Sequence, residues 1–197
     1  MNAIRRFCLV LLMVAAASPC LAVQLKVSRI SLERTLRQQL FNGPEGRYYL
    51  KGSAQTPCFV YAEDPHLVFA NGRIAVQLKT HAKLGTTIRN SCFGISLAPP
   101  TQVSVAPDGQ GETLGFRDAK LDKVSDHAEL NMVLSPFLSR QIPNSMRVNA
   151  ADLLRKALAQ STATSGYKVS LNKLMIHSIT VQGDDVILDV DAALSIE

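Results

Sequence analysis

The stretch 57–92 constrains the fold of this chain more than any other. Two runs of alternating apolar residues flank Asn71-Gly72, the strongest short-range signal for a β-hairpin, because both residues tolerate the positive φ of a type I′ turn. A two-residue turn fixes the register and places Phe69 opposite Ile74. One face of the predicted hairpin then carries a continuous apolar surface, made of Leu67, Phe69, Ile74, Val76 and Leu78. The rest of the chain must cover this face.

The first 22 residues have the composition of a secretory signal peptide. Two arginines precede an apolar run, and a small residue, Ala22, ends the segment, so we expect cleavage between Ala22 and Val23. Lipoprotein processing at Cys20 is the alternative, but Pro19 stands where a lipobox has a small residue. Cleavage leaves 197 − 22 = 175 residues, and we expect one domain, 23–197, in the periplasm.

Cleavage would also remove two of the four cysteines and leave Cys58 and Cys92, which bracket the hairpin. In an oxidising compartment we expect these two thiols to form a disulfide. Such a bond contributes roughly 3 to 4 kcal/mol in the chain-entropy model. The organising unit of the fold would therefore be a covalently closed antiparallel sheet.

The mature chain keeps 19 of the 21 Lys and Arg residues and all 16 acidic ones, which gives a formal charge of +3. The basic residues are scattered singly, without runs or interleaved aromatic residues, so we do not expect nucleic acid as a partner. No stretch after residue 22 approaches the 18 apolar residues of a membrane span. These features favour a soluble envelope protein.

The remaining patterns predict a meander of short strands followed by helices and a final hairpin. Strands are expected at 23–30, 47–52, 58–62, 66–78, 82–89, 93–97, 101–106, 112–121, 172–182 and 185–196. The hairpin 101–121 is expected to turn at 107–111, where proline and glycine gather. The fold class is therefore α+β.

Three amphipathic helices are expected. Ser31 caps the first, through Leu40, whose leucine stripe favours core packing, with a membrane-surface helix as the alternative. The second begins at Asp126, where Asp126 and Glu129 resemble a capping box, and Pro136 leaves a strand at 128–134 as its alternative. Asn149 caps the third, which ends near residue 160.

The final hairpin turns at Gly183-Asp184. Two-residue pairing sets Val181 opposite Val186, Ile179 opposite Leu188, Met175 opposite Ala192 and His177 opposite Val190. One face is then apolar throughout, with His177 as a hydrogen-bonded core histidine. Asp189 and Asp191 are expected to point outward.

Chemical motifs are weak. Gly94–Ala98 approaches a nucleophile elbow, but two prolines follow it rather than a helix, and Ser170-x-x-Lys173 leads into a strand. The four histidines lack metal-binding spacing. We therefore expect no catalytic residues, no metal and no cofactor, and an enzyme is the weakest of the functional classes.

The order of elements resembles that of the YceB-like envelope proteins. In this chain it comprises a strand and a leucine-striped helix opened by Ile30-Ser31, a meander, late helices and a final alternating strand pair, over about 27–196. The YceB-like proteins are similar to single modules of the tubular lipid-binding (TULIP) superfamily. The resemblance implies a curved antiparallel sheet wrapped around two or three helices, an apolar tunnel and no catalytic residues. It also implies a lipoprotein, but the sequence departs from the family there, because Pro19 precedes Cys20 where a lipobox has a small residue.

Two functions compete. One is the binding of a lipid or another hydrophobic small molecule in a groove between the curved sheet and the helices, with possible peripheral membrane contact. The other is an envelope scaffold or interaction domain with a fully packed core. If a groove exists, scarce helical cover leaves it open, and the candidates for its apolar lining are Leu36, Phe69, Val76, Phe137, Leu154, Ile179 and Leu188.

Overall fold

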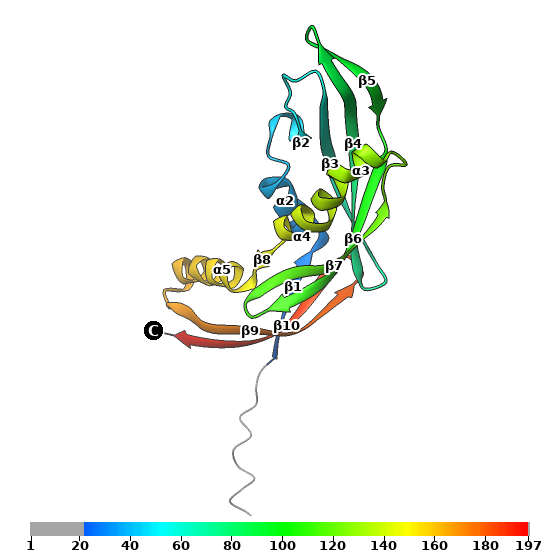
Figure 1. Ribbon diagram of the computed structural model, residues 1–197. Coiled ribbons are helices and arrows are strands. Elements are labelled where there is room, and N and C mark those ends of the chain that lie inside the picture. Colours follow the sequence, from blue (N-terminus) through cyan, green and yellow to red (C-terminus); the bar gives the residue numbers. More distant parts are fainter. Residues whose placement is uncertain (1–21, 197) are drawn as a thin grey trace, which may run out of the picture.

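Two antiparallel sheets form the frame of the protein (Figure 1). The computed structural model describes residues 22–196, so the expected signal peptide lies outside the described residues except for Ala22. The larger sheet has seven strands in the order β2-β3-β4-β6-β7-β8, with β5 paired to β4, and the smaller sheet has the order β1-β10-β9. The strands are β1 (Ala22–Ser28), β2 (Tyr48–Lys51), β3 (Phe59–Ala70), β4 (Arg73–Ile88), β5 (Ser91–Leu97), β6 (Pro100–Gln110), β7 (Thr113–Lys123), β8 (Val148–Asn149), β9 (Val169–Gln182) and β10 (Asp185–Ile196).

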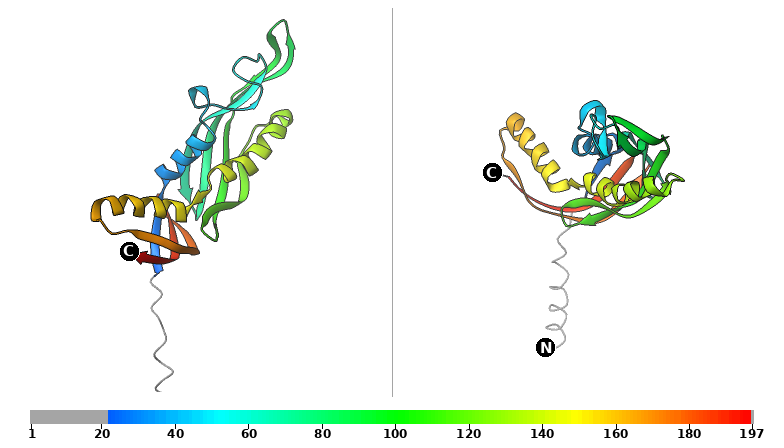
Figure 2. Two further views of the ribbon diagram at one scale, coloured as in Figure 1. Left: turned by 90° about the vertical axis from the view of Figure 1, so that its left-hand side faces the viewer. Right: turned by 45° about the horizontal axis from the view of Figure 1, so that its top comes forward.

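The helices divide between the two sheets. They are α2 (Arg29–Gln39), the 3-10 turn η1 (Pro44–Gly46), α3 (Ala128–Pro136), the π-helical turn η2 (Phe137–Gln141), α4 (Ile142–Ser145) and α5 (Ala150–Ser165). Helix α2 and the run α3-η2-α4 lie inside the curl of the larger sheet, whereas α5 lies over the smaller one (Figures 1 and 2). The expected α+β fold, a curved antiparallel sheet around helices, is confirmed.

The central hairpin has the predicted turn and register. Asn71 and Gly72 have φ values of 52° and 70°, and Phe69 pairs with Ile74. Beyond the turn, β4 continues without a break to Ile88, so the two strands expected at 66–78 and 82–89 share one long element. Every second residue of β4 from Ile74 to Leu84 is buried beneath the helices.

The disulfide between Cys58 and Cys92 is present, with a Cα–Cα distance of 5.0 Å. It joins the segment before β3 to strand β5. Strand β5 pairs only with the far end of β4. The disulfide therefore gives β5 a second attachment to the sheet, through the segment before β3.

The hairpin of β6 and β7 turns later than predicted. Strand β6 runs to Gln110, and the turn is Gly111-Glu112, with a φ of 61° at Gly111. Gly109 lies in the strand because its backbone approaches β9: a Cβ atom there would lie 3.0 Å from Cγ2 of Ile176. The glycine that suggested a turn therefore marks the close packing of one sheet on the other.

Helix α2 packs its leucines into the core, as expected. Leu32 and Leu36 are 0% exposed, which excludes a membrane-surface stripe. Its predicted N-cap is wrong: Arg29 is already helical, and the backbone N–H of Ser31 donates to Oγ of Ser28 at 3.3 Å. The helix begins three residues earlier than predicted because Ser28, the last residue of β1, provides the cap.

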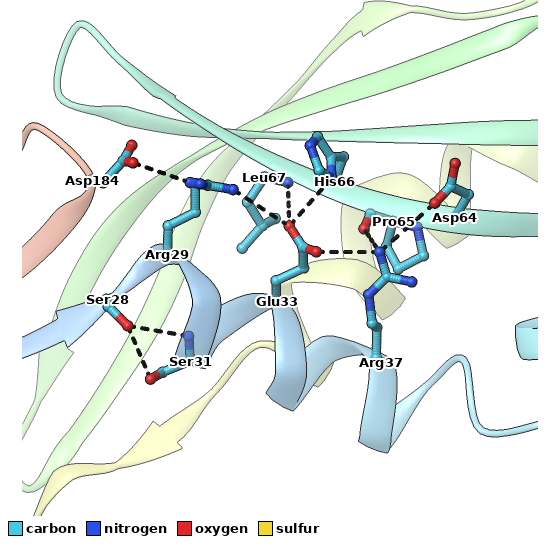
Figure 3. A network of polar contacts seen from close by, with 10 residues as sticks. All are labelled: Ser28, Arg29, Ser31, Glu33, Arg37, Asp64, Pro65, His66, Leu67 and Asp184. Carbon is cyan, nitrogen blue, oxygen red and sulfur yellow. Dashed lines mark hydrogen bonds and ion pairs between the residues drawn. The ribbon is translucent and has the colours of Figure 1, made fainter.

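One polar side chain attaches α2 to an irregularity in β3 (Figure 3). The register of β3 shifts around Asp64, which has a φ of 56°. Glu33 reaches this bulge, and its Oε2 accepts a hydrogen bond from the backbone N–H of Leu67 at 3.2 Å. Its Oε1 accepts from Nη2 of Arg37 at 3.2 Å, and the same nitrogen donates to the carbonyl of Pro65 at 2.7 Å. Since β2 pairs with β3 only as far as Ala62, no strand lies beside Leu67 on that edge of β3, and the carboxylate accepts its N–H instead.

The segment from Ala128 is helical, so the strand alternative is wrong. Its expected capping box does not form, and the N–H of His127 instead donates to Oγ of Ser125 at 3.1 Å. The chain passes Pro136 as a π-helical turn rather than as a break. Its buried face, at most 3% exposed, fills the curl of the sheet and comprises Leu130, Leu134, Phe137, Leu138 and Ile142.

The final hairpin follows the predicted register only near its turn. The pairs Val181–Val186 and Ile179–Leu188 are present, but Ala192 pairs with Leu174 rather than with Met175. The register shifts between Asp189 and Val190 and again between Ala193 and Leu194. Each shift leaves one extra residue on β9.

The role expected for His177 is also wrong. Val190 pairs with Ile176, which makes His177 the extra residue of the first bulge. The side chain of His177 is 52% exposed and forms an ion pair with Asp191 on the outer face. On the same face, Oδ1 of Asp189 accepts a hydrogen bond from Nε2 of Gln24 at 3.0 Å. Asp189 and Asp191 therefore point outward, as predicted.

Candidate functional site

The two bulges keep the apolar side chains of β9, except that of Met175, on one face of the β9–β10 ribbon. The apolar residues on this face are spaced by two or three positions along β9, and each step of three contains one bulge residue, Asn172 or His177. We call this surface the ribbon face. It consists of Val169, Leu171, Leu174, Ile176, Ile179 and Val181 on β9 with Val186, Leu188, Val190, Ala192, Leu194 and Ile196 on β10.

On β10, the cover of the ribbon face decreases along the strand. Near the turn, Val186, Leu188 and Val190 are 0% exposed. Toward the far end of β10, Leu194 is 51% and Ile196 71% exposed, although their backbones remain paired with β9. Because Leu171, the cross-strand partner of Leu194, is 8% exposed, it is the β10 side of the ribbon that extends beyond the covering elements.

Helix α5 lies along this less covered part (Figure 2). Asn149 caps it as predicted, since its Oδ1 accepts from the N–H of Asp152 at 2.9 Å. The N–H of Ala150 donates to the carbonyl of Glu112 at 2.9 Å, which fixes the first turn to the β6–β7 hairpin. The helix runs to Ser165, past the expected end, because the first residue with the positive φ of a C-terminal stop is Gly166, at 78°.

A hollow of about 530 Å³ lies between α5 and the start of β9. We call it the α5 groove. Its lining combines apolar and cationic side chains and comprises Arg155, Ala159, Lys168, Val169, Ser170 and Leu171. Arg155 is positioned by Asp152 at 3.0 Å and Glu112 at 3.4 Å. The arrangement can hold an apolar group next to two cationic side chains, of which Arg155 is already paired with carboxylates.

The predicted lining residues lie mostly in the packed interior. Leu36, Val76 and Leu188 are 0% exposed and Phe137 is 3% exposed, so a ligand reaches them only by displacing core side chains. Phe137 stacks on the ring of Tyr48 at 5.1 Å. The other three candidates, Phe69, Leu154 and Ile179, are partly buried against the core.

Only Leu154 among these candidates belongs to α5, next to the groove residue Arg155. Sequence reasoning missed the groove because it ended the helix near residue 160 and began the last hairpin at Asn172. The steps of three between apolar residues of β9, such as Leu171 to Leu174, are the signal that would have extended the apolar face to Val169.

The titratable groups whose pKa is clearly shifted lie outside the α5 groove. In the described part of the chain, histidine, cysteine and acidic residues form no group of three that could hold a metal ion. Lys79 lowers the pKa of the Asp64 carboxyl, and Asp64 raises the pKa of Lys79. Burial raises the pKa of Tyr61, and the hydrogen bond to Glu63 raises that of Arg47. Each shift moves the group further from neutrality, whereas a general acid or base needs a pKa near the working pH.

No known family model matches this sequence, and no curated protein is significantly similar to it. Within residues 22–196, none of the helices is long and apolar enough to cross a membrane.

Proposed function

We propose that this protein binds an apolar chain with an anionic headgroup, such as a fatty acid, in the α5 groove. It would do so in the periplasm and without catalysis, as the resemblance to the YceB-like and TULIP proteins implies. The observation that carries the proposal is the ribbon face, which continues past its cover at Leu194 and Ile196 beside a hollow of about 530 Å³. Exposed apolar surface next to a concave site is typical of ligand binding.

The groove has the size and the chemistry that such a ligand needs. Small-molecule sites occupy about 300 to 1,000 Å³. Ala159, Val169 and Leu171 provide apolar walls for methylene groups, and Lys168 and Arg155 provide positive charge for a carboxylate or phosphate. A headgroup held by Lys168 would orient the ligand in the groove.

The expected affinity follows from the number of methylene groups that the groove covers. Burial of about ten to fourteen of them at roughly 0.8 kcal/mol each contributes about 8 to 11 kcal/mol. The loss of translational and rotational freedom removes at least about 4 kcal/mol of this. The dissociation constant should therefore lie between roughly 10 μM and 1 mM, which sets the titration range.

One observation favours the alternative, a scaffold or interaction domain. The space between the larger sheet and α2, α3 and α4 is filled by buried side chains, with Leu36 and Val76 at 0% exposure. If the α5 groove binds no ligand, the packed interior leaves the scaffold function as the better one.

The test is a titration of the mature protein with cis-parinaric acid, a fluorescent fatty acid, followed by displacement with palmitate. Ala159→Trp fills the groove, and Ala157→Trp places the same ring about 200° around the helix, where Ala157 is exposed. We expect Ala159→Trp to weaken binding about tenfold or more and Ala157→Trp to leave it unchanged. Equal effects of the two substitutions, or no saturable displacement, would contradict the proposal.

The charged edge has a separate test. Lys168→Gln should weaken the binding of palmitate about three- to tenfold, because a charge-assisted contact becomes a neutral one. It should leave the binding of 1-hexadecanol, which has the same chain and no charge, unchanged. An equal loss for both ligands would mean that Lys168 acts on the shape of the groove and not on the headgroup.

A further inference from the structure

The end of the molecule opposite α5 carries a second exposed apolar surface. The hairpin of β4 and β5 protrudes beyond the helices that fill the curl of the sheet (Figure 1). At the base of this hairpin Leu84 is 7% exposed, and its cross-strand partner Ile95 is 45% exposed. Further out, Phe93 and Ile88 are 59% and 50% exposed. These residues continue the buried face of β4, because opposite residues of an antiparallel pair share a face.

We call Ile88, Phe93 and Ile95 the tip patch. The disulfide supports it from behind, since Cys92 pairs with Thr87 on the other face of the hairpin, and Oγ1 of Thr87 lies 3.6 Å from Sγ of Cys58. The apolar side chains are thus presented by a two-stranded element with a covalent anchor. Docking then needs little additional ordering of the chain.

The segments that form this end of the molecule carry charge of a single sign. Neither 46–62 nor 81–107 contains an acidic residue, and these two segments form the β2 strand, the disulfide and the whole β4–β5 hairpin end. Lys51, Lys83 and Arg89 are exposed there, whereas Arg47 is paired with Glu45 and Glu63, which flank the first segment. Nζ of Lys83 lies 5.7 Å from the ring of Phe59, on the side of the disulfide.

We infer that this hairpin docks the protein on an anionic lipid bilayer, with Ile88 and Phe93 inserted among the headgroups and with Arg89 and the two lysines against anionic lipids. Three apolar side chains are too few for a stable protein interface, which takes about 20 to 30 residues on each side. A small apolar tip surrounded by cations is sufficient for reversible binding at a membrane surface. The inference stands on a surface separate from the α5 groove and does not depend on it.

Sedimentation with vesicles tests the docking. The mature protein should bind vesicles of phosphatidylcholine and phosphatidylglycerol and should bind pure phosphatidylcholine vesicles about tenfold more weakly. Ile88→Ser with Phe93→Ser should reduce binding to the anionic vesicles about tenfold or more. Ile30→Ser, at a position that is 62% exposed on α2, is the matched control and should have no effect. Lys83→Gln with Arg89→Gln should reduce the salt dependence of binding.

The chain contains no tryptophan. The fluorescence of one introduced tryptophan therefore reports how deeply that position lies in the membrane. Phe93→Trp should show a blue-shifted emission on vesicle binding and quenching by brominated lipid, whereas Ile30→Trp should show neither. Failure of the wild-type protein to bind anionic vesicles, or undiminished binding by the Ile88→Ser, Phe93→Ser variant, would overturn the inference. That variant should retain the thermal unfolding of the wild type and its palmitate displacement, which separates this result from a failure of the α5 groove.

Discussion

Removal of the Glu33 carboxylate should destabilise the protein more than its position on a helix surface suggests. The side chain is only 16% exposed, and its Oε2 is the acceptor for the N–H of Leu67 at the β3 bulge (Figure 3). A hydrogen bond to a charged group contributes about 1.5 to 3 kcal/mol. The partly exposed pairs with Arg37 at 3.2 Å and Arg29 at 3.9 Å add about 0.2 to 1 kcal/mol each. We therefore expect Glu33→Ala to cost about 2 to 5 kcal/mol.

The measurement is urea and thermal unfolding of the mature chain. For a domain of this size, 1 kcal/mol corresponds to about 2 to 4 °C, so Glu33→Ala should lower Tm by roughly 4 to 20 °C. Glu33→Gln keeps an oxygen acceptor for Leu67 and should cost about half as much. Glu129→Ala, at an exposed position in the first turn of α3, is the control and should stay within about 0.5 kcal/mol of the wild type. If Glu33→Ala is no worse than this control, the bulge does not depend on the carboxylate and the reasoning is wrong.

Three further outcomes are expected. Replacement of both Cys58 and Cys92 by alanine should lower the unfolding free energy by about 4 kcal/mol for a sequence separation of 34 residues, and a loss below about 1 kcal/mol would contradict the loop-entropy argument. The lowered pKa of Asp64 stabilises the fold above the ordinary aspartate pKa of about 3.9 and ceases to do so as the pH falls through the lowered value, so the advantage of the wild type over Asp64→Asn should be present at about pH 5 and vanish toward pH 2 in unfolding curves. Lys79, with its raised pKa, stays charged over this range. Intact mass of the exported protein should correspond to a chain that begins at Val23, and a diacylglyceryl group on the cysteine three residues upstream would refute this processing.

Local chemistry explains the features that were predictable from the sequence. Asn71-Gly72 sets a turn and a register because its two residues alone supply the φ values required, and Asn149 caps α5 through an atom three residues from its donor. The pairing of Cys58 with Cys92 followed from the expected loss of the other two cysteines. These inferences needed no knowledge of distant contacts.

Features that depend on distant contacts were not predictable in this way. Gly109 stands in a strand because β9 passes against it, which the local proline and glycine could not reveal. The bulge at His177 changes which side chain faces the core, because a shift of one residue reverses the faces of a strand. At Gly109, the approach of one sheet to the other decided the conformation.

The candidate site belongs to the same class. The alternation of apolar residues in β10 was visible in the sequence. The same alternation occurs in a strand whose apolar face is buried and in one whose apolar face is exposed. Leu188 and Leu194 occupy equivalent positions on β10, and they differ only in how far the covering elements reach: one is 0% exposed and the other 51%. The sequence thus determined which side chains share a face, and the tertiary structure decided which part of that face stays open to a ligand, because cover depends on the lengths and positions of elements elsewhere in the chain.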